Sequence, residues 1–198
     1  WSEVNDLPTI KSRFRGAGTQ TASVTFGGFT PLGPNTNYNT TEKYDGTNWT
    51  TSGNMNTARC YMAGFGTQTA AVSAGGATLN PDVGFNKTEE YNGTSWSEVN
   101  NMPTYQRNHF GVGTLTAGVT TGGKSGPSSS YPGITDTNTT FEYDGTNWTA
   151  GGTSLITGGS ISGGGTQTVA FFAGYPQAGG NQTLHYDGTS FTTSASLA

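Results

Sequence analysis

One stretch of the chain, Gly118–Ser125 (GVTTGGKS), has glycine, lysine and serine at a spacing that could bind a phosphate. It satisfies the pattern G-x-x-x-x-G-K-[ST], in which backbone N–H groups cradle the phosphates and the lysine reaches the outer ones. Such a loop needs a helix directly after it, because the helix N-terminus faces the anion. The next residues, GPSSSYPG, cannot form a helix, since proline and glycine interrupt it. We therefore expect no nucleotide site here.

Other residues that could do chemistry are few and dispersed. The two histidines, His109 and His185, fall in different predicted strands, so we expect neither a metal site nor an acid–base pair. Cys60 is the single cysteine, which excludes an internal disulfide and favours a small buried side chain. Loop 133–140 offers oxygen ligands but lacks the carboxylate density of a calcium site. The sequence predicts no enzyme, no metal and no cofactor.

The composition favours strands and excludes several partners. Glycine occurs 32 times among 198 residues, and the rest is rich in Thr, Ser, Asn and aromatic residues, which suit strands and tight turns. The net charge is −4, so nothing attracts a nucleic acid backbone. No run of apolar residues is long enough to span a membrane. Because the first residue is Trp1, we expect a processed product or part of a longer chain.

Internal repeats dominate the sequence. The phrase KYDGTNWT (43–50) returns as EYNGTSWS (90–97), EYDGTNWT (142–149) and HYDGTSFT (185–192). A second phrase, GTQT or GTLT, follows each Trp at a constant distance. The repeats predict one domain, 1–198, made of units 1–48, 49–95, 96–147 and 148–190 with a trailing outer strand 191–198. The structural positions that recur from unit to unit are Trp1, Trp49, Trp96, Trp148, Tyr44, Tyr91, Tyr143 and Tyr186.

Each unit is expected to form four short antiparallel strands. The first contains the Trp, and the second is typified by CYMAGFG, residues 60–66. The third alternates apolar and polar residues up to a Gly-Gly pair, and the fourth ends at the Tyr. Asp-Gly or Asn-Gly then predicts a hairpin turn whose two central residues both have positive φ. This turn chemistry accounts for the recurring Asp45, Asp144 and Asp187 without any acid–base role.

Four strands per unit, with Gly-Gly, Tyr and Trp at set places, resemble the kelch repeat of β-propellers. Similar Gly/Thr-rich sequences with GTQTAA and YDGTSW occur in proteins of marine phages and bacteria. The resemblance implies an all-β propeller of four-stranded blades, with CYMAGFG innermost and the Trp strand outermost. The sequence departs from the family in its closer Tyr–Trp spacing, and the fourth unit has Gly174-Tyr175 and Phe191 in place of Gly-Gly and Trp.

The two ends of the chain leave one outer strand in excess. The chain begins with an outer strand at Trp1 and ends with another at Phe191. Three interpretations follow. One end strand is spare, or the four units are part of a longer array, or the extra strand completes a neighbouring molecule in a homo-oligomer; the sequence is compatible with all three.

Sequence variation concentrates in the loops between the Gly-Gly pair and the Tyr strand. In a propeller blade, counted from the innermost strand, these loops join the second strand to the third. These loops span 29–40, 77–87, 124–139 and 175–182, and they differ in length and content. Recognition commonly uses such loops on a rigid scaffold. We expect the aromatic rings in these loops to be exposed, and exposed rings beside Asn, Ser and Thr suit sugars. The candidate ligand-binding residues are therefore Phe29, Tyr38, Phe85, Tyr131 and Tyr175. The alternative is that each ring covers its own loop.

These observations predict a non-enzymatic binding module, extracellular or associated with a virion, such as a phage fibre, appendage or decoration protein. Its partner would be a surface glycan, a protein receptor or another virion protein. The alternative is a purely structural repeat unit that assembles with other copies through its edge strand, since an unpaired edge invites strand addition.

Overall fold

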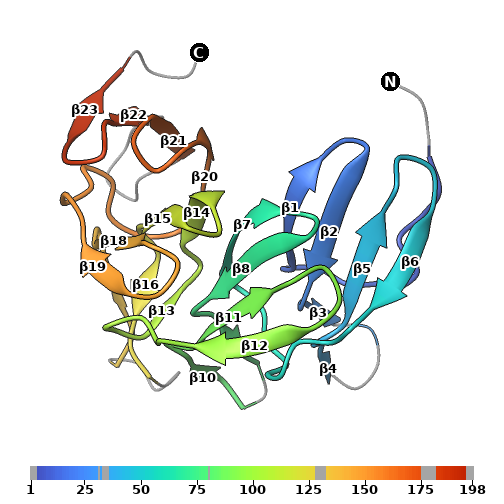
Figure 1. Cartoon of the computed structure of the whole chain (residues 1–198). Coiled ribbons are helices and arrows are strands. Elements are labelled where there is room, and N and C mark those ends of the chain that lie inside the picture. Colours follow the sequence, from blue (N-terminus) through green and yellow to red (C-terminus); the bar gives the residue numbers. More distant parts are fainter. Residues whose placement is uncertain are drawn as a thin grey trace.

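The structure, a computed structural model, describes residues 4–30, 32, 36–79, 81–127, 133–174 and 182–194. Four antiparallel sheets of four strands each follow one another along the chain (Figure 1). Every element in this described part is a strand, so the predicted all-β class is confirmed. It contains no helix of the length and apolarity that crossing a membrane requires.

The strands of each sheet follow one order. The first sheet contains β1 (Arg15–Thr19), β2 (Ala22–Phe26), β5 (Thr41–Tyr44) and β6 (Trp49–Ser52). The second contains β7 (Ala63–Thr67), β8 (Ala70–Ala74), β11 (Thr88–Tyr91) and β12 (Trp96–Val99). The third contains β14 (Phe110–Thr114), β15 (Ala117–Thr121), β18 (Thr140–Tyr143) and β19 (Trp148–Ala150). The fourth contains β20 (Ile161–Gly165), β21 (Ala170–Gly174), β22 (Gln182–Tyr186) and β23 (Phe191–Thr193).

Short strands form within the variable loops and beside them. The first sheet's loop holds the pair β3 (Phe29–Thr30) and β4 (Thr36–Asn37), and the second holds β9 (Ala77–Thr78) and β10 (Val83–Gly84). A three-stranded ribbon joins β13 (Gln106–Arg107), β16 (Lys124–Ser125) and β17 (Thr135–Asp136).

The first strands of the four sheets lie side by side. Strand β7 contacts both β1 and β14, and β14 contacts β20. The strands that carry Trp or its replacement lie at the opposite edge of each sheet, so the predicted order from CYMAGFG to the Trp strand is confirmed. The first and fourth sheets stand at the two ends of this row (Figure 1).

Each sheet takes three strands from one repeat unit and its outer strand from the beginning of the next. Trp49, where the second unit begins, lies in the last strand of the first sheet. Phe191 likewise completes the fourth sheet. Trp1 lies outside the described residues, and the described residues between Val4 and Lys11 form no strand.

The Asp-Gly hairpins differ from the predicted turn. The loop between β5 and β6 spans four residues, 45–48, and only Gly46 in it has positive φ, at 97°. The side chain of Asp45 accepts hydrogen bonds from the backbone N–H of Thr47 at 2.8 Å and of Asn48 at 2.7 Å. The prediction of two positive φ values is wrong because this carboxylate closes the loop in place of a tight two-residue turn.

The second predicted strand begins later than expected. Ladder pairing in the second sheet starts at Ala63, whereas the prediction covered 60–66. Tyr61 has a left-handed φ of 59°, which interrupts an extended strand. The same conformation recurs at the equivalent positions of the other units, Arg13, Asn108 and Ser160. A strained turn thus precedes every first strand.

Aromatic side chains join each sheet to the one before it. Trp96 of the second sheet packs edge-on against Phe26 of the first, with ring centroids 4.8 Å apart, and donates its Nε1–H to Thr41 Oγ1 at 2.9 Å. Trp148 repeats that hydrogen bond to Thr88, also at 2.9 Å. The repeat tyrosines are all buried: Tyr44, Tyr91, Tyr143 and Tyr186. The repeated aromatic residues therefore form the contacts between sheets.

Side-chain volumes are matched across these contacts. Phe65 on β7 lies directly over Gly118 on β15, where an added Cβ would stand 2.2 Å from Phe65 Cε2. The equivalent contacts combine smaller side chains with alanine: Ala17 with Ala71, and Val112 with Ala170. Glycine at position 118 makes room for the largest side chain of the three.

Gly118→Ala should therefore lower the free energy of unfolding by about 1–3 kcal/mol, because an extra methyl group overpacks the contact with Phe65. Chemical denaturation measures this change. Gly164→Ala is the matched control, since its nearest side chain, Phe171, is 47% exposed and can move aside. Equal losses in both variants would contradict the assigned packing.

Candidate functional site

The two ends of the sheets carry different sequences. At one end lie the Thr-Gln and Asp-Gly turns, which repeat a template and which we call the turn end. At the other end, low in Figure 1, lie the short strands of the loops 29–40, 77–87 and 124–139, as far as they are described. We call this the loop end.

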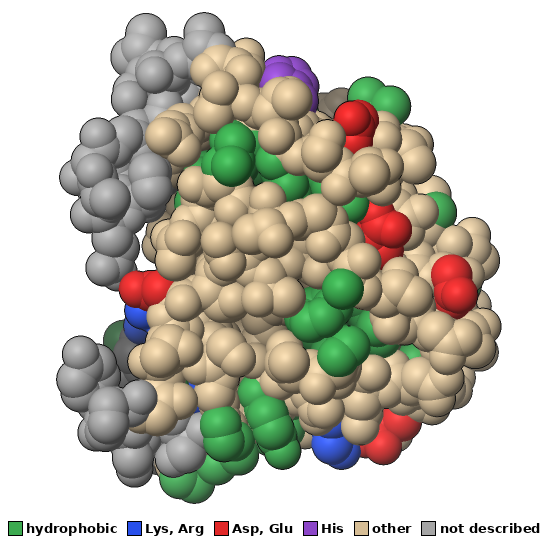
Figure 2. All heavy atoms as spheres, turned by 90° about the vertical axis from the view of Figure 1, so that its left-hand side faces the viewer, with side chains coloured by type: hydrophobic (Ala, Val, Ile, Leu, Met, Phe, Trp, Pro, Cys, Tyr) green, Lys and Arg blue, Asp and Glu red, His purple; other side chains and the backbone are tan. Residues whose placement is uncertain are grey.

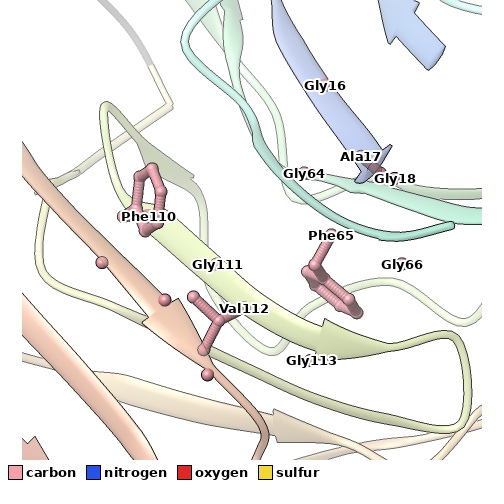
Figure 3. A pocket seen from close by; sticks show the side chains of 13 residues that line it. Gly16, Ala17, Gly18, Gly64, Phe65, Gly66, Phe110, Gly111, Val112 and Gly113 are labelled. Carbon is pink, nitrogen blue, oxygen red and sulfur yellow. The ribbon is translucent and has the colours of Figure 1, made fainter. Parts of the chain in front are cut away.

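An open pocket of about 200 Å³ runs between the first strands of all four sheets (Figure 3). Nine glycines form most of its wall: Gly16, Gly18, Gly64, Gly66, Gly111, Gly113, Gly163, Gly164 and Gly165. Phe65, Phe110 and Val112 supply its larger side chains. None of the lining residues is titratable, so this wall offers no general acid, base or nucleophile.

At the loop end, the residues that precede the first strands stand next to one another. The backbone N–H of Tyr61 donates to the carbonyl of Arg13 at 3.2 Å, and the N–H of Asn108 donates to the carbonyl of Tyr61 at 2.7 Å. Their φ values, 57°, 59° and 55°, are nearly equal. A repeated backbone thus places three different side chains, from three sheets, side by side.

Arginine occurs only near these positions, and two of the four arginines are neutralised. Arg59 pairs with Glu89, with Nη1 and Oε1 2.5 Å apart, and Arg107 pairs with Asp82. Within the described residues Arg13 and Arg15 have no ion pair. In the part of the loop end that the structure describes, two positive charges are therefore without an ion pair.

These two arginines are held in place by aromatic and backbone contacts. The Arg13 guanidinium lies 5.0 Å from the ring centre of Tyr61 and 5.3 Å from that of Phe29, and the residue is exposed. Arg15 is half-buried and donates from Nη1 to the carbonyl of Phe14 at 3.2 Å. Burial lowers the pKa of Arg15, and its buried Nε has no hydrogen-bond partner in the described structure.

The predicted ligand-binding rings occupy different environments. Phe29 is only 4% exposed, because it lies in β3 and Arg13 covers it, so the expectation of an exposed ring is wrong there. Tyr38 and Phe85 are half-buried at equivalent positions, where their N–H groups donate to the Gly-Gly carbonyls at 2.8 Å. Tyr131 and Tyr175 lie outside the described residues. Sequence reasoning missed Arg13, which itself has the left-handed φ, and Arg15, which follows two residues later.

Two potentially reactive side chains near the loop end are buried. Burial raises the pKa of the Cys60 thiol to about 12, so it is not a thiolate near neutral pH. Burial, followed by the charge of Arg15, lowers the pKa of His109 to about 3, so its ring is neutral. Met62 and Ile161, which occupy the positions equivalent to His109 in the second and fourth units, are core residues. Both side chains serve packing, as predicted for Cys60.

The remaining candidates have structural partners. Lys124 follows the two glycines in a strand, β16, rather than before a helix, and its Nζ pairs with Asp136 Oδ1 at 2.6 Å. Residues 118–125 therefore lie in and between two strands, β15 and β16, as the repeat predicts. Backbone hydrogen bonds lower the pKa of the turn carboxylates, Asp45, Asp144 and Asp187. In the described part of the chain no three His, Cys, Asp or Glu residues come together as metal ligands.

No protein-family model and no curated protein matches this chain. The kelch resemblance and the likeness to phage proteins therefore stay predictions. We infer the function from the loop end, where the differing side chains and the uncompensated charges coincide.

Proposed function

We propose that this chain is a non-enzymatic recognition module of the β-propeller type, with the four sheets as kelch-like blades. The strand order within each sheet and the contacts between first strands support this architecture. The module belongs outside the cell or on a virion, as part of a fibre, appendage or decoration, and binds a surface glycan through its loop end.

The observation that carries the proposal is the placement of different side chains on one repeated backbone at the loop end. Arg13, Tyr61 and Asn108 occupy equivalent positions in three sheets, while the turn end repeats the same residues. Rings of half-buried Tyr38 and Phe85 can contact the C–H faces of sugars, and amides can bond their hydroxyl groups. Arg13, which has no carboxylate partner among the described residues, favours a glycan that carries a carboxylate or sulfate group.

Arg13→Asn should weaken binding to such an acidic glycan by about tenfold or more, the equivalent of about 1.4 kcal/mol, because a charge-assisted contact is lost. Asparagine suits the backbone, since Asn108 adopts the same left-handed φ at the equivalent position. Binding is measured on a glycan array and on whole cells, followed by calorimetry with the glycan that binds.

Lys43→Gln is the matched control, because it removes one positive charge at the turn end, where Lys43 Nζ contacts the carbonyl of Gly93. Its affinity should stay that of the wild type. A third variant replaces loop 77–87 by the short GGNQT sequence. Glycan binding that survives both Arg13→Asn and this loop replacement would contradict the proposed site.

A further inference from the structure

The fourth sheet leaves exposed a position that the other three sheets bury. Val24, Val72 and Val119 occupy equivalent places in the second strands of the first three sheets, and each is 0% exposed. Phe171 stands at the same place in β21 and is 47% exposed. In the first sheet, Val24 belongs to a cluster with Trp96 of the second, so the following sheet provides the cover. Within the described residues no sheet follows the fourth.

A glutamine in the turn between the first and second strands of a sheet stabilises two of the contacts between sheets. Gln68 of the second sheet donates from Nε2 to the carbonyls of Ser23, at 3.1 Å, and Tyr44, at 2.7 Å, in the first. Gln167 of the fourth sheet makes the same two hydrogen bonds to the third, at Gly118 and Tyr143. The equivalent carbonyls of the fourth sheet belong to Ala170 and Tyr186. No glutamine of the described chain reaches them.

The first sheet carries the complementary half of this contact, also uncovered. Gln20 is the equivalent of Gln68 and Gln167, and it is exposed. Trp49 is half-buried, whereas Trp96 and Trp148 are 6% and 8% exposed. One end of the row of sheets therefore offers the donor side of the repeated contact, and the other end offers the acceptor side.

We propose that two copies of this chain associate head to tail, the first sheet of one copy packing on the fourth sheet of the other. The contact continues the one that the chain already makes between its own sheets. Gln20 of the partner subunit would donate to the carbonyls of Ala170 and Tyr186, and the aromatic side of that sheet would cover Phe171. Sheet faces meet, so the contact differs from strand addition at an edge.

Apolar exposure at the fourth sheet suits this partner. The side of the molecule that carries the outer strands of the third and fourth sheets shows separate apolar patches, with several charged side chains between them (Figure 2). Val169, beside Phe171, is 74% exposed and extends the apolar area. A head-to-tail contact closes into a ring when its rotation allows and otherwise forms a chain of copies. The proposal holds whatever the loop end binds.

Sedimentation velocity over a concentration series tests the proposal. The wild type should show a mass above that of one chain, rising with concentration. Phe171→Glu and Gln20→Glu should each raise the dissociation constant about tenfold or more. Both side chains are substantially exposed, so both variants should fold, which circular dichroism and thermal unfolding check. Val83→Glu, an exposed apolar residue of β10 at the loop end, is the matched control and should associate like the wild type.

A mixing experiment tests the head-to-tail geometry. Phe171→Glu leaves the first-sheet face intact, and Gln20→Glu leaves the fourth-sheet face intact. Mixed in equal amounts, the two variants should form a heterodimer although each alone is monomeric. A wild type that stays monomeric at every concentration overturns the proposal, as does association that both folded variants leave unchanged. A mixture that stays monomeric overturns the head-to-tail arrangement.

Discussion

Glu89→Leu should lower the free energy of unfolding by about 3–5 kcal/mol, because it leaves a buried arginine without its counter-charge. The side chains of Arg59 and Glu89 are both 0% exposed. Glu89 also accepts hydrogen bonds from the backbone N–H of Asn56 at 2.6 Å and of Thr57 at 3.2 Å. Burial lowers the pKa of Arg59, and the neighbouring carboxylate opposes that shift. Urea denaturation near neutral pH measures the loss.

The third sheet indicates which pair of residues should restore the stability that Glu89→Leu removes. Gln106 and Phe141 of the third sheet stand where the second sheet has Arg59 and Glu89, and both are buried. The double variant Arg59→Gln/Glu89→Phe should therefore recover most of the lost stability, since it removes both charges together.

An exposed ion pair serves as the control for the buried one. Lys87 pairs with Glu98 at 2.6 Å, with side chains 36% and 50% exposed. Lys87→Ala should cost only about 0–1 kcal/mol. If Glu89→Leu costs no more than Lys87→Ala, the buried pair does not have the role assigned to it.

Acidification from pH 6.5 towards pH 3 should destabilise the protein through His109 by up to about 1.4 kcal/mol per pH unit. In the unfolded chain this histidine has its ordinary pKa of 6.5, and in the folded chain burial lowers the pKa to about 3. Between these values the unfolded state binds one more proton, so the free energy of unfolding falls as the pH falls. The contribution is complete above pH 6.5.

His109→Met should remove this part of the pH dependence and raise the stability at pH 7 by about 1–3 kcal/mol, because both buried ring nitrogens lack partners in the described structure. Methionine suits the site, since Met62 occupies the equivalent position. Denaturation curves of variant and wild type at pH 7, 6, 5 and 4 give the difference, in which shared carboxylate titrations cancel. His185→Gln, at an exposed position on β22, is the control. Parallel pH profiles for wild type and His109→Met would refute the assignment.

Local features of the fold could be predicted from the sequence with good accuracy. The Gly-Gly pairs, the Asp-Gly loops and the alternation in residues such as 70–74 depend on backbone sterics over a few neighbouring residues. The turn at Asp45 is an exception. The hairpin lies where it was predicted, but its loop is longer than the predicted two-residue turn, because the Asp45 side chain closes it through hydrogen bonds. The role of the turn carboxylates was likewise predictable, since their partners lie two and three residues away.

The candidate site was less predictable, because its features depend on residues far apart in the sequence. Glu89 neutralises Arg59 and Asp82 neutralises Arg107, yet nothing near Arg13 in the sequence indicates that it stays unpaired. The burial of Phe29 depends on Arg13, which lies in a separate segment of the chain. The rings that looked available in the sequence and the charges that are available in the structure are therefore different residues.

The repeat and most of its strands could be predicted from the sequence, because periodicity and turn chemistry act over short distances, and the family resemblance supplied the order of the strands within each sheet. Which of the equivalent residues are covered depends on how the sheets pack against one another. Val119 and Phe171 hold the same place in their repeats, yet one is buried and the other is 47% exposed. The difference lies in whether another sheet packs against them, and burial depends on that neighbour rather than on the strand itself.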